Sequence, residues 1–384
     1  MLKKIGIITL NGDFNYGNRL QNFALQHVLK KEGLYVDTII IQEEKTDKLS
    51  KELLLGNIST VADLYYVIKK IGKKLTIKNT LKRFSYRKMQ KKKYVLLSPF
   101  SKKYLSSVKV SRSQLNMIEK KYDLFVVGSD QVWNPNIIEF DETHFLNFTS
   151  EKKRCSYAAS LGIARFPTVP SKLAEHYAKH LNDMRYISVR EQAGALLVKN
   201  LIKKEVDVAP DPTLLLNKEE WLSKLEIIER ESSKDYVLLY FITPISSKVM
   251  DSILYFAQMK NMEIIQIMGD QYNETHQIVT PNEFVQLIND AAYFFTDSFH
   301  GTVFSIIMET NFLAYERSDG KGIKSRLETL LEKFQLQSLL ATEDVNVFEV
   351  DKLNDFTNTK KILRNEKNKG LHLISTNILS LLEE

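Results

Sequence analysis

The chain has 384 residues and a mass of 44.5 kDa, which exceeds the size at which single hydrophobic cores stop growing and predicts two domains that enclose a cleft. With 43% hydrophobic and 26% charged residues, the composition is that of a globular protein and excludes disorder over most of the chain. The net charge of +7 is unevenly distributed, because residues 69–103 hold fourteen Lys or Arg and no acid, and this disfavours a uniformly basic nucleic-acid binder.

The N-terminus and the single cysteine indicate where the protein works. The apolar stretch in MLKKIGIITL is too short for the core of a signal peptide, and no apolar run reaches the about 18 to 20 residues of a membrane span. Cys155 cannot form an internal disulfide and lies in the apolar run CSYAAS, so we expect it to be buried rather than nucleophilic. A cytoplasmic protein is expected.

The chain opens with a βαβ unit. Residues 3–10 and 34–41 are apolar almost throughout and are predicted to be parallel strands covered on both faces. Between them, the apolar residues of 19–33 follow the 3.6-residue period of a helix. Residues 43–115 are rich in Lys and prone to form helices, and we interpret them as an insertion in the first domain.

Strands and helices alternate over the rest of the chain, which indicates two doubly wound Rossmann-like α/β domains facing a cleft. The first domain is predicted at residues 1–205 and the second at residues 206–384, with the proline-bearing segment 205–216 as the connection. The predicted strands are residues 122–128, 153–160, 185–191, 235–242, 262–269, 291–297 and 311–316, and a terminal helix is expected at 358–383.

The stretch TDSFHGT, residues 296–302, is the first candidate site. Ser298 is placed to cap the following helix, whose first amides, near Gly301 and Thr302, would form an anion site shared by His300. The alternative is that Ser298 only caps and His300 packs at a domain surface. A histidine there is suited to general acid or base chemistry as well as to holding an anion.

Arg190 ends the strand ISVRE and is the second candidate. Its guanidinium offers a planar fork for a carboxylate or a phosphate, although a salt bridge with Glu191 is an equal alternative. Two further loops and one aspartate supply hydrogen-bonding groups at strand ends, where ligands of open α/β sheets bind. They are candidates for acceptor or cleft residues: Asn15, Tyr16, Gly17, Asn18, Ser129, Asp130, Gln131, Trp133, Asn134 and Asp211.

These loops have plainer explanations too. The NGDFNYGN loop could be ordinary turn chemistry, and it is neither G-x-G-x-x-G nor the Walker lysine motif. In GSDQVWNP, Trp133 could be a stacking platform for a sugar or a buried side chain behind a capped turn. The sequence has no cluster with zinc spacing, no H-E-x-x-H and no G-x-S-x-G, so we expect no essential metal and no cofactor.

Several motifs in this order carry a family resemblance. NYGNRLQNFALQ, VVGSDQVWNP, SYAASLGI, ISVREQAGALL, DVAPDPTLLL and SFHGTVFSI together resemble the polysaccharide pyruvyl transferase family, over the length of the chain except residues 43–115. The resemblance implies a fold like that of GT-B glycosyltransferases and transfer of pyruvate from phosphoenolpyruvate onto two hydroxyls of one sugar, as a ketal. It maps the family's phosphoenolpyruvate-binding residues onto Arg190 and His300.

The resemblance also implies partners. The acceptor is expected to be a sugar of a cell-surface polysaccharide, such as an exopolysaccharide or capsule, or its lipid-linked precursor, and no nucleic acid is expected. Residues 69–103 could then contact anionic lipid at the inner face of the membrane. Two alternatives remain at this point: a nucleotide-sugar glycosyltransferase of the same fold, and a non-catalytic glycan-binding protein of a polymer assembly complex.

Overall fold

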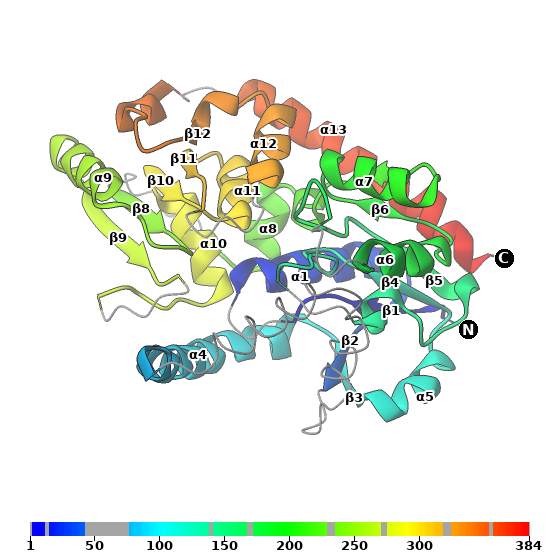
Figure 1. Ribbon diagram of the computed structural model, residues 1–384. Helices are drawn as coiled ribbons and strands as arrows, with labels where there is room; N and C mark the ends of the chain where they lie inside the picture. Colours follow the sequence, from blue (N-terminus) through cyan, green and yellow to red (C-terminus); the bar gives the residue numbers. More distant parts are fainter. Residues whose placement is uncertain are drawn as a thin grey trace.

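The structure of the protein, a computed structural model, contains two parallel β-sheets with helices packed around them (Figure 1). It describes residues 2–11, 15–42, 77–137, 141–166, 172–228, 235–269, 275–317, 324–352 and 356–383. Part of the expected insertion, residues 43–76, lies outside this described part.

The first sheet has five parallel strands in the order β3-β2-β1-β4-β5, the doubly wound order that follows from right-handed βαβ crossovers. Its central strands are buried on both faces, as their continuous apolar sequences predict. Parallel pairing of Cys155 with Tyr186 and of Ala159 with Val189 adds β6 and β7 beside β5. The strands are β1 (Lys4–Ile8), β2 (Tyr35–Gln42), β3 (Ser107–Ser111), β4 (Leu124–Val127), β5 (Arg154–Ser156), β6 (Ser188–Val189) and β7 (Asp207–Val208).

The second sheet is also parallel, in the order β12-β11-β10-β8-β9. The strand order reverses between β8 and β10, and this switch point is where open α/β sheets bind ligands. The stretch TDSFHGT begins at the end of β10, so it lies at the switch point. The strands are β8 (Tyr236–Tyr240), β9 (Glu263–Ile267), β10 (Tyr293–Thr296), β11 (Asn311–Tyr315) and β12 (Leu340–Ala341).

The helices follow the strands and start at capping residues that the sequence supplies. Asn15 caps α1, Ser298 caps α11, and Thr280 forms a capping box with Glu283 at α10. The helices are α1 (Tyr16–Lys31), α4 (Ile77–Tyr104), α5 (Leu115–Glu119), α6 (Leu173–Asn182), α7 (Gln192–Ile202), α8 (Lys218–Lys224), α9 (Ser247–Met259), α10 (Pro281–Asp290), α11 (Phe299–Met308), α12 (Lys324–Lys333) and α13 (Thr357–Leu373).

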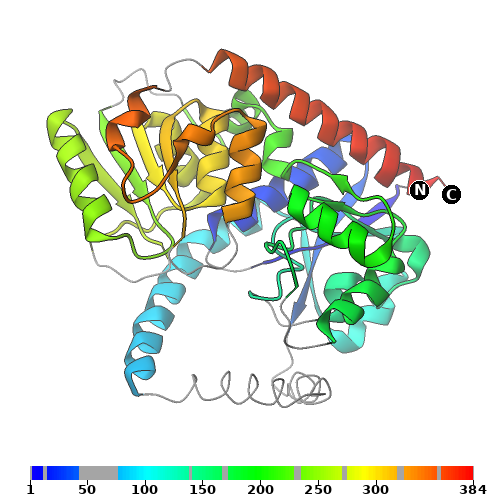
Figure 2. The same ribbon diagram turned by 45° about the horizontal axis from the view of Figure 1, so that its top comes forward.

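Two helices join the halves. The first helix, α1, lies between the two sheets, and its Phe23 packs against Trp221 of α8 with ring centroids 5.6 Å apart (Figure 1). The last helix, α13, runs back across the molecule so that the two chain ends lie close together (Figures 1 and 2). Beyond it, Asn377 donates a hydrogen bond to Asp207 of β7 at 3.4 Å. The C-terminal segment is therefore packed on both halves.

The structure departs from the predicted elements at two places. The expected insertion at residues 43–115 includes β3, which pairs with β2 because its alternating sequence SVKVS suits an edge strand with one wet face. The run of parallel strands continues through β7, past the expected domain boundary after residue 205. Within the described residues, no helix is both long and apolar enough to cross a membrane.

Candidate functional site

Three buried side chains meet between the two halves of the molecule. Arg190 follows β6, Asp211 follows β7, and His300 is the second residue of α11, just after β10. Arg190 Nη1 donates a hydrogen bond to Asp211 Oδ2 at 2.6 Å, and His300 Nε2 lies 3.4 Å from the same oxygen. The two positions that the sequence singled out for anion binding are thus linked through one carboxylate.

Arg190 still has two unused donors, although it is surrounded by acids. Asp130 Oδ1 lies 3.6 Å from Nη2 and Glu191 Oε1 lies 3.8 Å from Nε, distances at which charges attract without hydrogen bonding. Nε and Nη2 are buried, and neither has a hydrogen-bond partner among the residues that the structure describes. Burial alone would lower the pKa of Arg190, but the carboxylates of Asp211, Glu191 and Asp130 outweigh it and raise the pKa. The result is a permanently charged guanidinium whose Nε–Nη2 edge faces Asp130 and Glu191 without a hydrogen bond to either.

The start of α11 is arranged differently from the prediction. Ser298 Oγ accepts a hydrogen bond from the Gly301 amide at 3.1 Å, and the Thr302 amide donates to the Ser298 carbonyl at 2.9 Å. These two predicted anion donors are therefore used inside the helix start. The amides of Phe299 and His300, which have no acceptor in the described part of the chain, remain for a ligand.

His300 is closely packed between the two halves of the molecule. A Cβ added to Gly17 at the start of α1 would lie 2.0 Å from His300 Nδ1, so only glycine fits there. The other residues of this loop have structural roles: Asn15 Oδ1 accepts from the Asn18 amide at 3.3 Å, and the Tyr16 ring stacks on Phe284 of α10 at 4.7 Å. Gly17 is therefore the residue of the NYGN segment that lies against His300.

The GSDQVWNP loop reaches the site through one residue, Asp130, beside Arg190. Trp133 is fully buried, and its Nε1 donates to the His144 carbonyl at 2.8 Å. Gln131 and Asn134 bond to each other, since Asn134 Nδ2 donates to Gln131 Oε1 at 2.6 Å, and Ser129 Oγ donates to the Ala158 carbonyl. The buried tryptophan behind a turn, which the sequence left as an alternative to a stacking platform, is what the structure shows.

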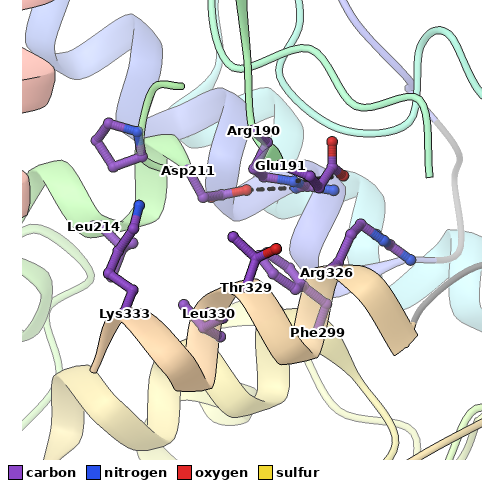
Figure 3. Close-up of a pocket in the computed structure, with 10 residues that line it drawn as sticks. Arg190, Glu191, Asp211, Leu214, Phe299, Arg326, Thr329, Leu330 and Lys333 are labelled. Carbon is purple, nitrogen blue, oxygen red and sulfur yellow. Dashed lines mark hydrogen bonds and ion pairs between the residues drawn. The ribbon is translucent and has the colours of Figure 1, made fainter. Parts of the chain in front are cut away.

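A second buried arginine, which the sequence analysis missed, completes the site. Arg326 of α12 is 3% exposed, and Figure 3 shows α12 across a hollow of about 20 Å³ from Arg190 and Asp211. The guanidinium carbons of Arg190 and Arg326 lie 4.4 and 5.5 Å from the centroid of the Phe299 ring. A charged residue on the apolar face of α12, in line with Leu327 and Leu330, was the sequence signal for it.

Arg326 has little to balance its charge. Its Nε is buried without a hydrogen-bond partner, and in the described part of the chain no carboxylate lies within ion-pair distance. Burial and then repulsion by Arg190 lower the pKa of Arg326 to about 10. Lys333 lines the same hollow but is paired with Glu366 at 2.7 Å. Glu191 and Asp130 attract the charge of Arg326 without outweighing burial and Arg190, so this charge is only partly compensated, which favours an anionic ligand.

Among the described residues, no group of three or more His, Cys, Asp or Glu side chains is placed to hold a metal ion. Cys155 is fully buried and burial raises the pKa of its thiol, which fits the packing role expected for it.

Two parallel doubly wound sheets with a site between them define the GT-B fold, and solved structures of this fold resemble the chain. A putative UDP-N-acetylglucosamine 2-epimerase from Listeria monocytogenes is 10% identical, with a TM-score of 0.51 over 99% of this chain and 98% of that one. S. aureus MnaA with UDP is 12% identical, with a TM-score of 0.50 over 100% and 98%. An alpha-glucosyltransferase with UDP and DNA is 10% identical, with a TM-score of 0.50 over 100% of both chains.

At such low identities these likenesses show the fold alone. The family comes from the sequence: residues 15–319 match the family model for polysaccharide pyruvyl transferase, and the chain belongs to this family. Membership implies a transferase that acts on polysaccharide. Among curated proteins, no sequence matches the chain.

Proposed function

We propose that the protein uses phosphoenolpyruvate as donor and forms a pyruvate ketal on two hydroxyls of one sugar in a polysaccharide or its lipid-linked precursor. Phosphoenolpyruvate carries a carboxylate and a phosphate on the same carbon, so its site needs fixed positive charge in two places. The observation that supports it most is the pair of buried guanidinium groups, Arg190 and Arg326, on either side of one hollow.

We assign one anionic group of the donor to each of the two arginines. The Nε–Nη2 edge of Arg190, which makes no hydrogen bond within the described residues, is a fork that matches the two oxygens of a carboxylate. Arg326 and the first amides of α11, at Phe299 and His300, then bind the phosphate, because a helix N-terminus favours anions. Asp130, Glu191 and Asp211 keep the empty site from carrying the full repulsion of its cations.

His300 is the titratable group beside the bound donor. Ketal formation adds a proton to the methylene carbon, a sugar hydroxyl attacks the central carbon and loses its proton, phosphate departs, and the second hydroxyl closes the ring as it loses its own proton. The buried His300 ring, whose Nε2 lies 3.4 Å from Asp211 Oδ2, can donate or accept a proton in these steps.

The test is incubation of the purified protein with phosphoenolpyruvate and a panel of glycan acceptors. We expect phosphate release together with an acceptor mass gain that matches a pyruvate ketal. Stabilisation of the protein by a nucleotide sugar but not by phosphoenolpyruvate, with no ketal formed, would instead support a glycosyltransferase. Acceptor binding that survives substitution of every cleft residue would support a non-catalytic glycan-binding protein.

Arg326 allows a sharper test of the donor site. Replacing Arg326 with methionine is expected to weaken phosphoenolpyruvate binding about 10- to 100-fold, since a hydrogen bond to a charged group contributes about 1.5–3 kcal/mol. The ligand-free variant should melt at a higher temperature, because an unpaired buried charge is removed. Lys333→Met is the matched control: the side chain lines the same hollow but is paired with Glu366. Equal donor affinity in both variants would argue against this assignment.

A lipid-linked acceptor would bring the protein to the membrane, and we propose α4 as its contact. Lys91, Lys92, Tyr94, Val95 and Leu96 are all exposed on this helix. The N-terminal part of α4 projects from the body of the molecule in Figure 2. Cations next to exposed apolar side chains suit the headgroup region of an anionic bilayer.

Co-sedimentation with anionic vesicles tests this contact. Binding is expected at low salt and should fall as salt is added, and Lys91→Gln with Lys92→Gln should weaken it about 30-fold, at about 1 kcal/mol for each lysine. Neutral vesicles are the control. A protein that stays in the supernatant with anionic vesicles at low salt would refute the proposal.

A further inference from the structure

Asp211 occupies the point where the two halves of the site meet, and both of its oxygens are used. Oδ1 accepts hydrogen bonds from the Thr213 amide at 3.0 Å and from Thr213 Oγ1 at 2.7 Å. Oδ2 accepts from Arg190 Nη1 at 2.6 Å and lies 3.4 Å from His300 Nε2. One oxygen therefore fixes the carboxylate to its own chain segment, and the other faces the two site cations.

The segment that carries Asp211 is rigid. Asp211 caps the short 3₁₀ helix Pro212–Leu215, and proline at the first position fixes the backbone there. The carbonyl of Thr213 accepts a hydrogen bond from Trp221 Nε1 at 3.0 Å, which ties this helix to α8. Asp211 lines the hollow but is only 1% exposed. A carboxylate held this firmly is suited to orient other groups.

Asp211 stays ionised in this position. Burial would raise its pKa, but His300 and Arg190 outweigh burial and hold the pKa of Asp211 well below its usual range. The charge of Asp211 determines which atoms of Arg190 and His300 face a ligand. Because Nη1 of Arg190 is bonded to Asp211, Nε and Nη2 are the donors left without a hydrogen bond among the described residues. His300 is confined between Asp211 on one side of its ring and Gly17 on the other.

We propose that Asp211 is a positioning residue, which orients Arg190 and His300 for the reaction without binding the donor itself. That these residues take part in a reaction rests on the proposed function. Their orientation by Asp211 rests on the contacts alone. The arrangement follows the general logic in which an acid or base is held by a third, buried group. As a negative charge beside an anion site, Asp211 also opposes anion binding while it aligns the cations.

Asp211→Asn separates these two effects. Loss of alignment is expected to lower kcat at least about 100-fold, as for removal of an orienting carboxylate elsewhere. Loss of the negative charge is expected to tighten binding of inorganic phosphate, measured by calorimetry, about three- to tenfold. A residue with only a structural role would instead lose turnover and phosphate binding together. Asp211→Glu restores the charge and should recover part of kcat.

Asp207→Asn is the matched control, since Asp207 lies on the same segment but is exposed and accepts from Tyr186 Oη at 3.0 Å. It should leave turnover and phosphate affinity unchanged. Asp211→Asn with wild-type kcat, or with phosphate affinity lost along with kcat, would overturn the inference. If the wild-type protein forms no ketal, the proposed function fails, while the phosphate titration still decides the role of Asp211: tighter binding supports it and unchanged or weaker binding rejects it.

Discussion

Replacing Arg190 with lysine is expected to reduce kcat/KM for phosphoenolpyruvate by at least about 100-fold. Lysine keeps the charge but replaces the planar fork with a single point of donation, which cannot hold a carboxylate at two oxygens while it also holds Asp211. Two charge-assisted hydrogen bonds at about 1.5 kcal/mol each account for a loss of this size. The effect should fall mainly on the apparent affinity for the donor.

The measurement is steady-state kinetics with phosphoenolpyruvate varied at a fixed acceptor concentration. Arg185→Lys is the matched control, because Arg185 precedes the same strand and is exposed. Its kinetics should equal those of the wild type. A donor KM in Arg190→Lys that stays at the wild-type value would contradict a direct contact between the guanidinium and the donor.

Replacing His300 with asparagine is expected to lower kcat by about 10²- to 10⁴-fold at saturating phosphoenolpyruvate, the usual contribution of a general acid or base. Asparagine is smaller than histidine, so it fits against Gly17, and its amide can still reach toward Asp211. Donor binding should weaken much less than turnover. The structure thus predicts a defect mainly in the chemical step.

Single-turnover experiments would separate the chemical step from binding. His372→Asn, at an exposed position on α13, is the control for the substitution itself. If His300→Asn retained near-normal turnover, His300 would be a residue that only holds charge. A variant with weakened donor affinity and unchanged kcat would lead to the same conclusion.

Both central residues of the site could be predicted from the sequence because of where they stand. Arg190 and His300 follow apolar strands of the two parallel sheets, and side chains at the carboxyl ends of such strands gather in the cleft. The fold was predictable for the same reason, since long apolar strands alternate with amphipathic helices. The hydrophobic pattern alone was sufficient to predict the long strands and helices.

Other features needed tertiary information. Arg326 lies inside an amphipathic helix, where an arginine is ordinarily a surface residue, and its burial follows from the packing of α12 over Phe299. Tyr16 and Trp133 have the sequence context of ligand contacts, yet both are buried by aromatic neighbours distant in the chain. The edge strand β3 is short and lies in a Lys-rich segment. The surrounding lysines obscured the alternation of apolar and polar residues that predicts a strand.

The position of α1 between the two sheets has a consequence for how the protein responds to its ligands. Gly17 on α1 lies against His300, while Arg190 and Arg326 reach the hollow from opposite halves. A small dianion bound by both arginines would bridge the two halves and add an interaction between them that the empty protein lacks. Ligand binding would then be detectable away from the site. The α1 amides would exchange hydrogen more slowly, and the melting temperature would rise with donor concentration.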